Sequence, residues 1–126
     1  GVFYNCILAG YDCRVLELLN EPLQGDKIIA FLICRYNTGV CHLLNLCVDV
    51  MMQTQGFGRF LLENFIDSLD KTVISIVVLE VRASNKIAQN LYKKLGFKFS
   101  GIKEAYYKDD YGHQEDALVF QKLFAE

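Results

Sequence analysis

The chain has 126 residues, of which 52% are hydrophobic and 22% charged, a composition typical of one folded globular domain rather than a disordered segment. A formal net charge of -2 argues against a surface built to hold nucleic acid. No apolar run reaches the roughly 20 residues of a membrane span. The sequence therefore predicts a single domain, residues 1–126, in the cytoplasm, with no membrane or nucleic acid as partner.

The cysteines and histidines limit the chemistry. The five cysteines are scattered without a Cys-x-x-Cys pair, and their odd number is typical of reduced thiols in a cytosolic protein. Cys47 lies inside an apolar run and is interpreted as a small core residue rather than a nucleophile. His42 and His113 are the only histidines, which argues against a zinc site or a histidine-based triad. We therefore expect no metal.

In chain order, the first half predicts an antiparallel meander. Residues 2–9 have apolar side chains at helical spacing and predict the end of a helix. Residues 13–19 and 27–35 predict two strands joined by a loop rich in turn formers. A short turn at residues 37–39 then leads into residues 43–50, an almost wholly apolar run that predicts a strand covered on both faces.

A glycine-bearing loop, Gln53-x-x-Gly56-x-Gly58, follows that strand and precedes a helix predicted over residues 58–69. The unpaired N–H groups and the positive dipole end of a helix N-terminus favour an anion such as phosphate. A plain tight turn explains two glycines equally well. Neither the dinucleotide fingerprint nor the triphosphate-loop motif is present.

The second half predicts a strand over residues 72–81, and the strand–helix–strand order implies that it lies parallel to the earlier strand. Ser84 and Asn85 cap a second helix that ends at Gly96. Closing strands are predicted at residues 98–102 and 117–124. Between them lies a polar loop over residues 106–112, whose three tyrosines either line a substrate opening or simply cover the loop.

Glu80 interrupts a run that otherwise predicts a buried strand, and a carboxylate there needs a partner or a solvent cleft. Two interpretations are open. Glu80 pairs with Arg82 on the same strand face, or it is a general base at the opening between the two parallel strands.

Asn85 and Tyr92 are seven residues apart and share one helix face, roughly 10 Å apart along the axis. An extended ligand could contact both of them. Alternatively, Asn85 is only a helix cap and Tyr92 is only a core aromatic.

Three motifs occur in order along the chain. They are Gln53-x-x-Gly56-x-Gly58, the run Leu79-Glu80-Val81-Arg82-Ala83-Ser84-Asn85, and Leu91-Tyr92-x-x-Leu95-Gly96-Phe97. Together they resemble the GNAT superfamily of N-acetyltransferases, and within it the RimI-type ribosomal-protein alanine N-acetyltransferases. The resemblance covers about residues 13–124. It implies an α/β (α+β) fold in which a mixed central sheet, flanked by helices, is splayed between two parallel strands.

The resemblance also implies an activity. The chain would be an N-acetyltransferase that uses acetyl-CoA as cosubstrate and acetylates the N-terminal alanine of a small-subunit ribosomal protein by direct attack of the amine. Its partner would be the N-terminal peptide of that protein, and the enzyme would be a monomer or weak dimer. The alternatives are acetylation of another peptide terminus, a lysine or a small amine, and CoA binding without catalysis.

Residue roles follow from the same resemblance. Glu80 matches the family's general base, and Tyr92 matches its general acid, which returns a proton to the CoA thiolate. The pantetheine arm would pair with the backbone of the motif strand and with one amide side chain, and the pyrophosphate would rest on the glycine loop. The cofactor-binding residues implied in this way are Leu46, Cys47, Val48, Gln53, Thr54, Gln55, Gly56, Phe57, Gly58, Arg59 and Asn85.

The chain departs from the family pattern at several positions. Val50 stands where proline is common, and Lys108 follows the tyrosine pair where proline is usual. Thr54 and Gln55 stand where basic residues are common, so the loop would hold pyrophosphate mostly by its backbone. The family's first strand and helix are expected to be missing before Gly1.

Overall fold

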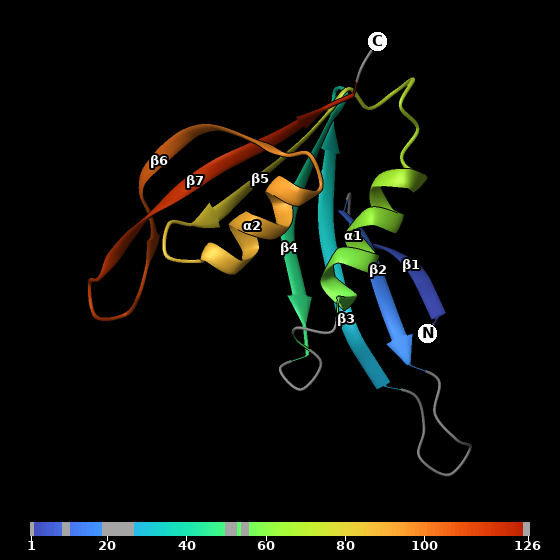
Figure 1. Ribbon diagram of the computed structural model, residues 1–126, viewed down its shortest axis with the longest axis horizontal. Helices are drawn as coiled ribbons and strands as arrows, with labels where there is room; N and C mark the ends of the chain where they lie inside the picture. The colour runs from blue at the N-terminus through green and yellow to red at the C-terminus, as the bar shows by residue number, and fades with distance from the viewer. Residues whose placement is uncertain (1, 9–10, 19–26, 50–52, 54–55, 125–126) are drawn as a thin grey trace.

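The computed structural model describes residues 2–8, 11–18, 27–49, 53 and 56–124. Neither helix in these ranges is long and apolar enough to cross a membrane. Figure 1 shows the elements, which in chain order are β1 Val2–Leu8, β2 Tyr11–Leu18, β3 Lys27–Asn37, β4 Val40–Val48, α1 Phe57–Ser68, β5 Ile76–Arg82, α2 Lys86–Lys94, β6 Lys98–Lys108 and β7 Gln114–Leu123.

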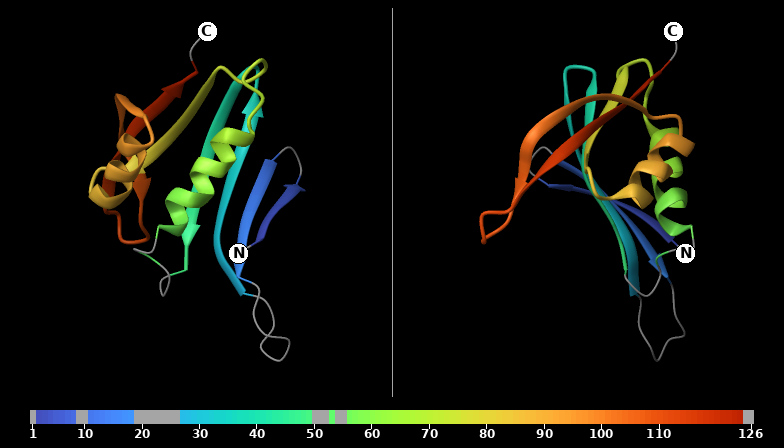
Figure 2. Two further views of the ribbon diagram at one scale, coloured as in Figure 1. Left: turned by 45° about the vertical axis from the view of Figure 1, so that its right-hand side comes forward. Right: turned by 60° about the vertical axis from the view of Figure 1, so that its left-hand side comes forward.

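The described strands form one mixed sheet in the order β1-β2-β3-β4-β5-β7-β6. Strands β1 to β4 are an antiparallel meander, β4 and β5 are parallel, and β7 pairs antiparallel with both β5 and β6. The meander and the parallel pair predicted from the sequence are confirmed. Both helices lie on the same face of this sheet (Figure 2).

The prediction that the motif strand is covered on both faces is wrong. Cys41 and Leu43 of β4 are buried beneath the helices, whereas Leu44 is 45% exposed. The reason is that α1 and α2 both cover the face to which the odd-numbered side chains of this stretch point. The strand also begins earlier than predicted, at Val40.

Three further segments differ from the sequence prediction. Residues 2–8 form β1, paired along β2, rather than the end of a helix. A short apolar segment fits both periodicities, and here the neighbouring strand decides between them. The predicted loop over residues 106–112 is shorter, because β6 continues to Lys108. Strand β5 begins at Ile76 instead of residue 72.

The hydrophobic core lies between the helices and the sheet. Helix α1 contributes Leu61, Leu62, Phe65 and Ile66, and its presence confirms the helix predicted for this stretch. At Gly58 an added Cβ would lie 3.2 Å from Cγ2 of Val48. The missing side chain therefore lets the first turn of α1 pack closely on the end of β4.

Two phenylalanines of α1 allow a test of this packing. Phe65 is fully buried and Phe60 is 50% exposed. We expect Phe65→Ala to lower the free energy of unfolding by about 3–5 kcal/mol, because it leaves a cavity in the core. Phe60→Ala, the matched control, should change it by about 1 kcal/mol or less. Urea denaturation measures both, and equal losses would contradict the orientation of α1.

Candidate active site

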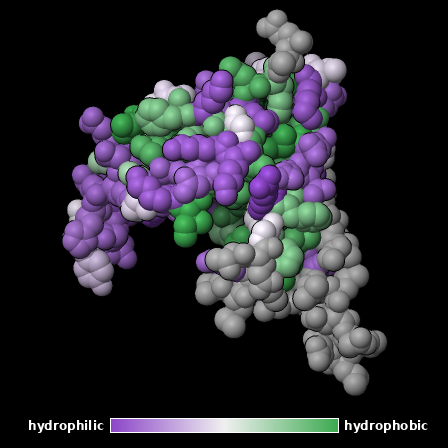
Figure 3. All heavy atoms as spheres, viewed as in Figure 1, coloured by the Kyte–Doolittle hydropathy of each residue, from purple (hydrophilic) through white to green (hydrophobic). Residues whose placement is uncertain are grey.

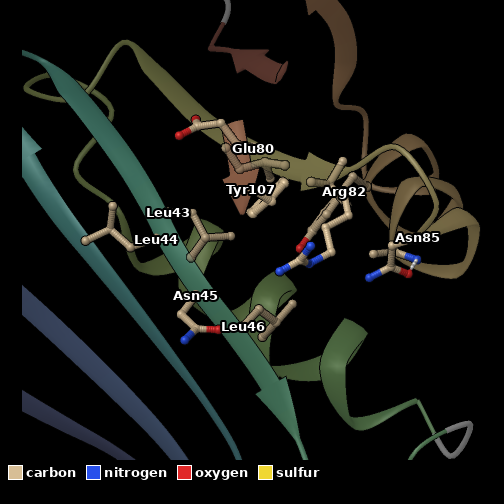
Figure 4. Close-up of a pocket in the computed structure, with 12 residues that line it drawn as sticks. Leu43, Leu44, Asn45, Leu46, Glu80, Arg82, Asn85 and Tyr107 are labelled. Carbon is tan, nitrogen blue, oxygen red and sulfur yellow. Dashed lines mark hydrogen bonds between the residues drawn. The ribbon is translucent and has the colours of Figure 1, made fainter. Parts of the chain in front are cut away.

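Strands β4 and β5 are paired only over residues 40–43 and 76–79. They then diverge, because β4 continues along β3 while β5 continues along β7. The gap holds a pocket of about 400 Å³. Figure 4 shows residues of β4, β5, α2 and β6 around it, and the full lining is Leu43, Leu44, Asn45, Leu46, Leu79, Glu80, Val81, Arg82, Asn85, Ala88, Tyr92 and Tyr107.

This pocket is lined from both faces of the sheet. Side chains alternate along β5, so Leu79 and Val81 are buried on the helical face whereas Glu80 and Arg82 belong to the open face. Tyr92 of α2 lines the pocket from the helical side. Because side chains of both faces line the pocket, a molecule in the gap can be contacted from both sides of the sheet. The outer surface of α2 is largely hydrophilic, as Figure 3 shows.

Glu80 has three partners on the open face. Its side chain is 6% exposed, and Nε2 of His42 lies 2.9 Å from each of its two oxygens. The hydroxyl of Tyr106 donates to Oε1 at 3.2 Å, and Nζ of Lys103 lies 3.6 Å from the same oxygen. The carboxylate is thus surrounded by groups that can donate hydrogen bonds to it.

Arg82 is not among those partners, so of the two interpretations of Glu80, the one in which it pairs with Arg82 is wrong. The Arg82 guanidinium instead lies 3.2 Å from Oε1 of Glu115 and 4.2 Å from the centre of the Tyr107 ring. The backbone N–H of Ser84 donates to the other oxygen of Glu115 at 2.7 Å. Hydrogen bonding to Ser84, followed by Arg82, lowers the pKa of Glu115.

Tyr92 has its ring in the core and lines the pocket. The ring centroid lies 5.8 Å from that of Phe97 and 6.5 Å from that of Phe120, and the residue is 8% exposed. Burial, then the nearby Tyr107 and Cys47, raises the pKa of Tyr92 to about 12. Within the described part of the chain its hydroxyl makes no hydrogen bond. The phenol is therefore protonated at neutral pH and able to donate.

An irregularity in β6 accompanies the placement of Tyr107 in the pocket lining and of Tyr106 beside Tyr107 and Glu80. The register along β7 shifts, and Ala105 adopts a left-handed φ of 50° while its N–H donates to Asp116 at 2.9 Å. Tyr107 lines the pocket, and the Tyr106 ring lies edge-on at 5.0 Å from it. Tyr111 is 87% exposed and does not join them.

The glycine loop ends at a helix N-terminus without a side-chain cap. Gly56 is the N-cap residue with a φ of 84°, it supplies no side-chain cap hydrogen bond, and the first turn holds no acidic residue. Phe57, Gly58 and Arg59 form this turn. The Arg59 side chain pairs with Glu63 at 2.6 Å, so it lies along the helix.

The remaining loop residues are only partly described. Gln53 folds back, and its Nε2 donates to the carbonyl of Val48 at 3.2 Å. Val50, Thr54 and Gln55 lie outside the described residues. Gln53 therefore lies beside the end of β4.

The motif strand presents an edge to the gap. Leu46, Cys47 and Val48 pair with β3 on one side only, because the pairing with β5 has ended. Cys47 is partly exposed and its thiol donates to Asn45 at 3.0 Å, so the prediction of a core position for Cys47 is wrong. Cys47 is partly exposed because β5 no longer pairs with β4 at this position.

Asn85 caps α2, as predicted, since its Oδ1 accepts the N–H of Ala88 at 3.1 Å. Asn85 also lines the pocket.

No cluster of three or more side chains suited to a metal ion occurs among the residues that the structure describes.

Sequence reasoning missed His42 as a site residue. His42 is aligned with Val78 in the parallel pair, so Glu80 is two residues further along β5 and on the same face. Strand β4 was predicted to begin at residue 43, one residue after His42, and its almost wholly apolar sequence showed no alternation that could reveal the register. The histidine was instead considered only as a metal ligand or a member of a triad.

A profile of the acetyltransferase (GNAT) family matches residues 12–97. The chain belongs to the GNAT acetyltransferase family. The likeness to solved members confirms the mixed α/β GNAT fold predicted from the sequence.

Relatives of this GNAT chain carry a specific name. The chain is 43% identical to the [ribosomal protein bS18]-alanine N-acetyltransferases of Haemophilus ducreyi and Escherichia coli K12. Both alignments span 96 residues, or 76% of this chain. The matches cover 66% and 64% of those proteins, slightly less than two thirds of their length.

Solved structures of the GNAT family superpose on the chain. The crystal structure of the ribosomal-protein-S18-alanine N-acetyltransferase from Escherichia coli has a TM-score of 0.72 at 36% identity, covering 89% of this chain and 70% of that one. Arabidopsis thaliana NAA60 in complex with acetyl-CoA has a TM-score of 0.82 at 18% identity, covering 92% and 77%. The second likeness concerns the fold alone.

Proposed function

We propose that this chain transfers the acetyl group of acetyl-CoA to the α-amine of an N-terminal alanine, with ribosomal protein bS18 as the acceptor. The observation that carries the proposal is the position of Glu80. Its carboxylate, with a side chain only 6% exposed, lines the pocket where β4 and β5 diverge. The name of the bacterial relatives supports the choice of acceptor.

The residues of the gap fit acetyl-CoA. The edge of β4 at Leu46, Cys47 and Val48 can pair with an extended chain of amides such as pantetheine. The uncapped first turn of α1 offers N–H groups to a pyrophosphate. Asn85 uses its Oδ1 as a helix cap, which leaves its Nδ2 to donate to an amide carbonyl. The residues from Gln53 to Arg59 are thus assigned to the cosubstrate.

Glu80 is assigned the role of general base. An N-terminal ammonium with a pKa of about 8 loses its proton at a cost of about 1.4 kcal/mol at pH 7, so one carboxylate is sufficient. The neutral amine then attacks the thioester carbonyl. As the amide forms, the nitrogen loses a second proton, which in the overall balance replaces the proton given to the CoA thiolate.

Tyr92 is assigned the role of general acid. It lines the pocket from the helical side, opposite the face that carries Glu80. Because burial raises the pKa of Tyr92 to about 12, the phenol holds its proton until the CoA thiolate leaves. Acid and base therefore act from the two faces of the sheet.

A comparison of two peptides tests the function. We expect turnover with a peptide that begins with a free alanine, and none with the same peptide blocked at its terminus but carrying a free lysine. A lysine with a pKa near 10.4 costs about 4.6 kcal/mol to deprotonate at pH 7. Release of the CoA thiol measures both reactions.

The competing functions give different results in this assay. Acetylation of the lysine peptide or of small amines instead would show a GNAT enzyme with another acceptor. CoA binding without turnover of either peptide would show a CoA-binding module. An alanine-initiated peptide with the bS18 sequence should also react faster than a scrambled one, and equal rates would contradict the choice of bS18.

A further inference from the structure

Glu80 needs a route by which it can lose the proton it has taken. After each turnover the carboxyl group must return to its charged form, yet its side chain is only 6% exposed. The His42 side chain is 30% exposed, and its Nε2 lies 2.9 Å from both carboxylate oxygens. The imidazole therefore stands between the carboxylate and water.

The other two partners of Glu80 are poorly suited to take this proton. A lysine ammonium such as that of Lys103 has donors and no acceptor. The hydroxyl of Tyr106 already donates to Oε1 at 3.2 Å. Histidine is the side chain that both gains and loses protons near neutral pH.

His42 does not line the pocket, whereas Glu80 does. His42 can therefore act on the reacting atoms only through the carboxylate of Glu80. This arrangement makes His42 a positioning and proton-accepting partner of Glu80 rather than a second base in contact with the substrate.

We propose that His42 accepts the proton that Glu80 takes from the acceptor amine and passes it to solvent. This inference rests on the acetyl transfer proposed above. In that reaction an ammonium and acetyl-CoA give an acetylated amine, the CoA thiol and one proton. That proton leaves Glu80 as its O–H bond breaks and an N–H bond forms at Nε2 of His42, and a ring nitrogen then releases it to water.

Charged and polar groups of the neighbouring strands surround His42. Arg35 of β3 is the antiparallel partner of His42. On the other side are Glu80 of β5 and, bonded to it, Lys103 and Tyr106 of β6. The imidazole thus lies between β3 and β5, next to the Glu80 carboxylate and with one face of its surroundings open to solvent, since its side chain is 30% exposed.

Substituting His42 by glutamine tests the proposal. His42→Gln keeps an amide donor that can hold Glu80 in place but cannot carry the proton. We expect kcat with the alanine-initiated peptide to fall about 10-fold at pH 7, with an unchanged KM for acetyl-CoA. The defect should disappear above about pH 9, where the acceptor amine is already neutral.

A second variant separates proton transfer from folding. His42→Ala should show the same defect, and added imidazole should restore most of the lost rate, because a free base can enter the vacated space. His113→Gln is the matched control, since this histidine also faces a carboxylate, Asp109 at 2.8 Å, but lies in the β6–β7 turn with its side chain 81% exposed. It should retain full activity.

The outcomes distinguish a failure of the role of His42 from a failure of the proposed acetyl transfer. Full activity of His42→Gln, a loss that is the same at every pH, or no rescue by imidazole would overturn the role of His42 and leave the acetyl transfer standing. Failure of the unaltered chain to acetylate any amine would overturn the proposed function and, with it, the role of His42.

Discussion

Replacing Glu80 by glutamine is expected to lower kcat with an alanine-initiated peptide by about 10²- to 10⁴-fold at pH 7. The amide has the shape of the carboxylate and can still accept the hydrogen bond from Tyr106, which is 3.2 Å in length. It cannot accept a proton from the acceptor ammonium. The binding of acetyl-CoA should be unchanged, since the residues assigned to it lie on β4, α1 and α2 rather than around Glu80.

Steady-state kinetics with calorimetric binding of CoA checks this expectation. Glu17→Gln is the control, because it removes a carboxylate from β2, outside the pocket. The defect of Glu80→Gln should shrink as the pH rises past the pKa of the acceptor amine, about 8. Turnover equal to that of the unaltered chain would remove Glu80 from its assigned role.

Replacing Tyr92 by phenylalanine is expected to give the second largest loss, about 10²-fold in kcat. The ring, packed 5.8 Å from Phe97, stays in place, and only a hydroxyl without a hydrogen bond in the described part of the chain is lost. The free energy of unfolding should therefore change by less than about 1 kcal/mol. Tyr111→Phe, which alters a tyrosine that is 87% exposed, should be silent in both measurements.

The pH dependence gives an independent check on Tyr92. Because its pKa is raised to about 12, the neutral donor form persists as pH rises and is lost only near that value. The unaltered chain should thus show no falling limb in kcat near pH 10, the ordinary value for tyrosine. A falling limb there that vanishes in Tyr92→Phe would contradict a raised pKa. Unfolding of Tyr92→Phe would instead assign the residue to the core alone.

The parts of the fold that follow from local pattern were predictable from the sequence. The apolar face of α1, the parallel pair around it and the Asn85 cap each depend on periodicity or on a few neighbouring residues. The glycine loop was placed correctly for the same reason, and the structure adds that Gly58 also allows close packing on Val48.

The features of the fold and of the site that were not predicted depend on contacts between residues far apart in the sequence. The exposure of Leu44 follows from both helices lying on one face of the sheet, which no single segment specifies. The position of Tyr107 depends on the bulge that Asp116 holds through the N–H of Ala105, eleven residues away. The pairing of Glu80 with His42 depends on the register of two strands that are 38 residues apart at these positions.

The short pairing of β4 and β5 bears on the order in which substrates bind. Only four residue pairs join the β1–β4 half of the sheet to the β5–β7–β6 half, so the two halves are connected weakly next to the pocket. A cosubstrate that pairs with the edge of β4 would take the place of the missing strand and fix one half against the other. His42 already holds Glu80 against β4, whereas Tyr107, on the other half, would be set against the edge of β4 only after the cosubstrate has bound. For the proposed acetyl transfer we therefore expect an ordered mechanism, in which acetyl-CoA binds first and the acceptor peptide second.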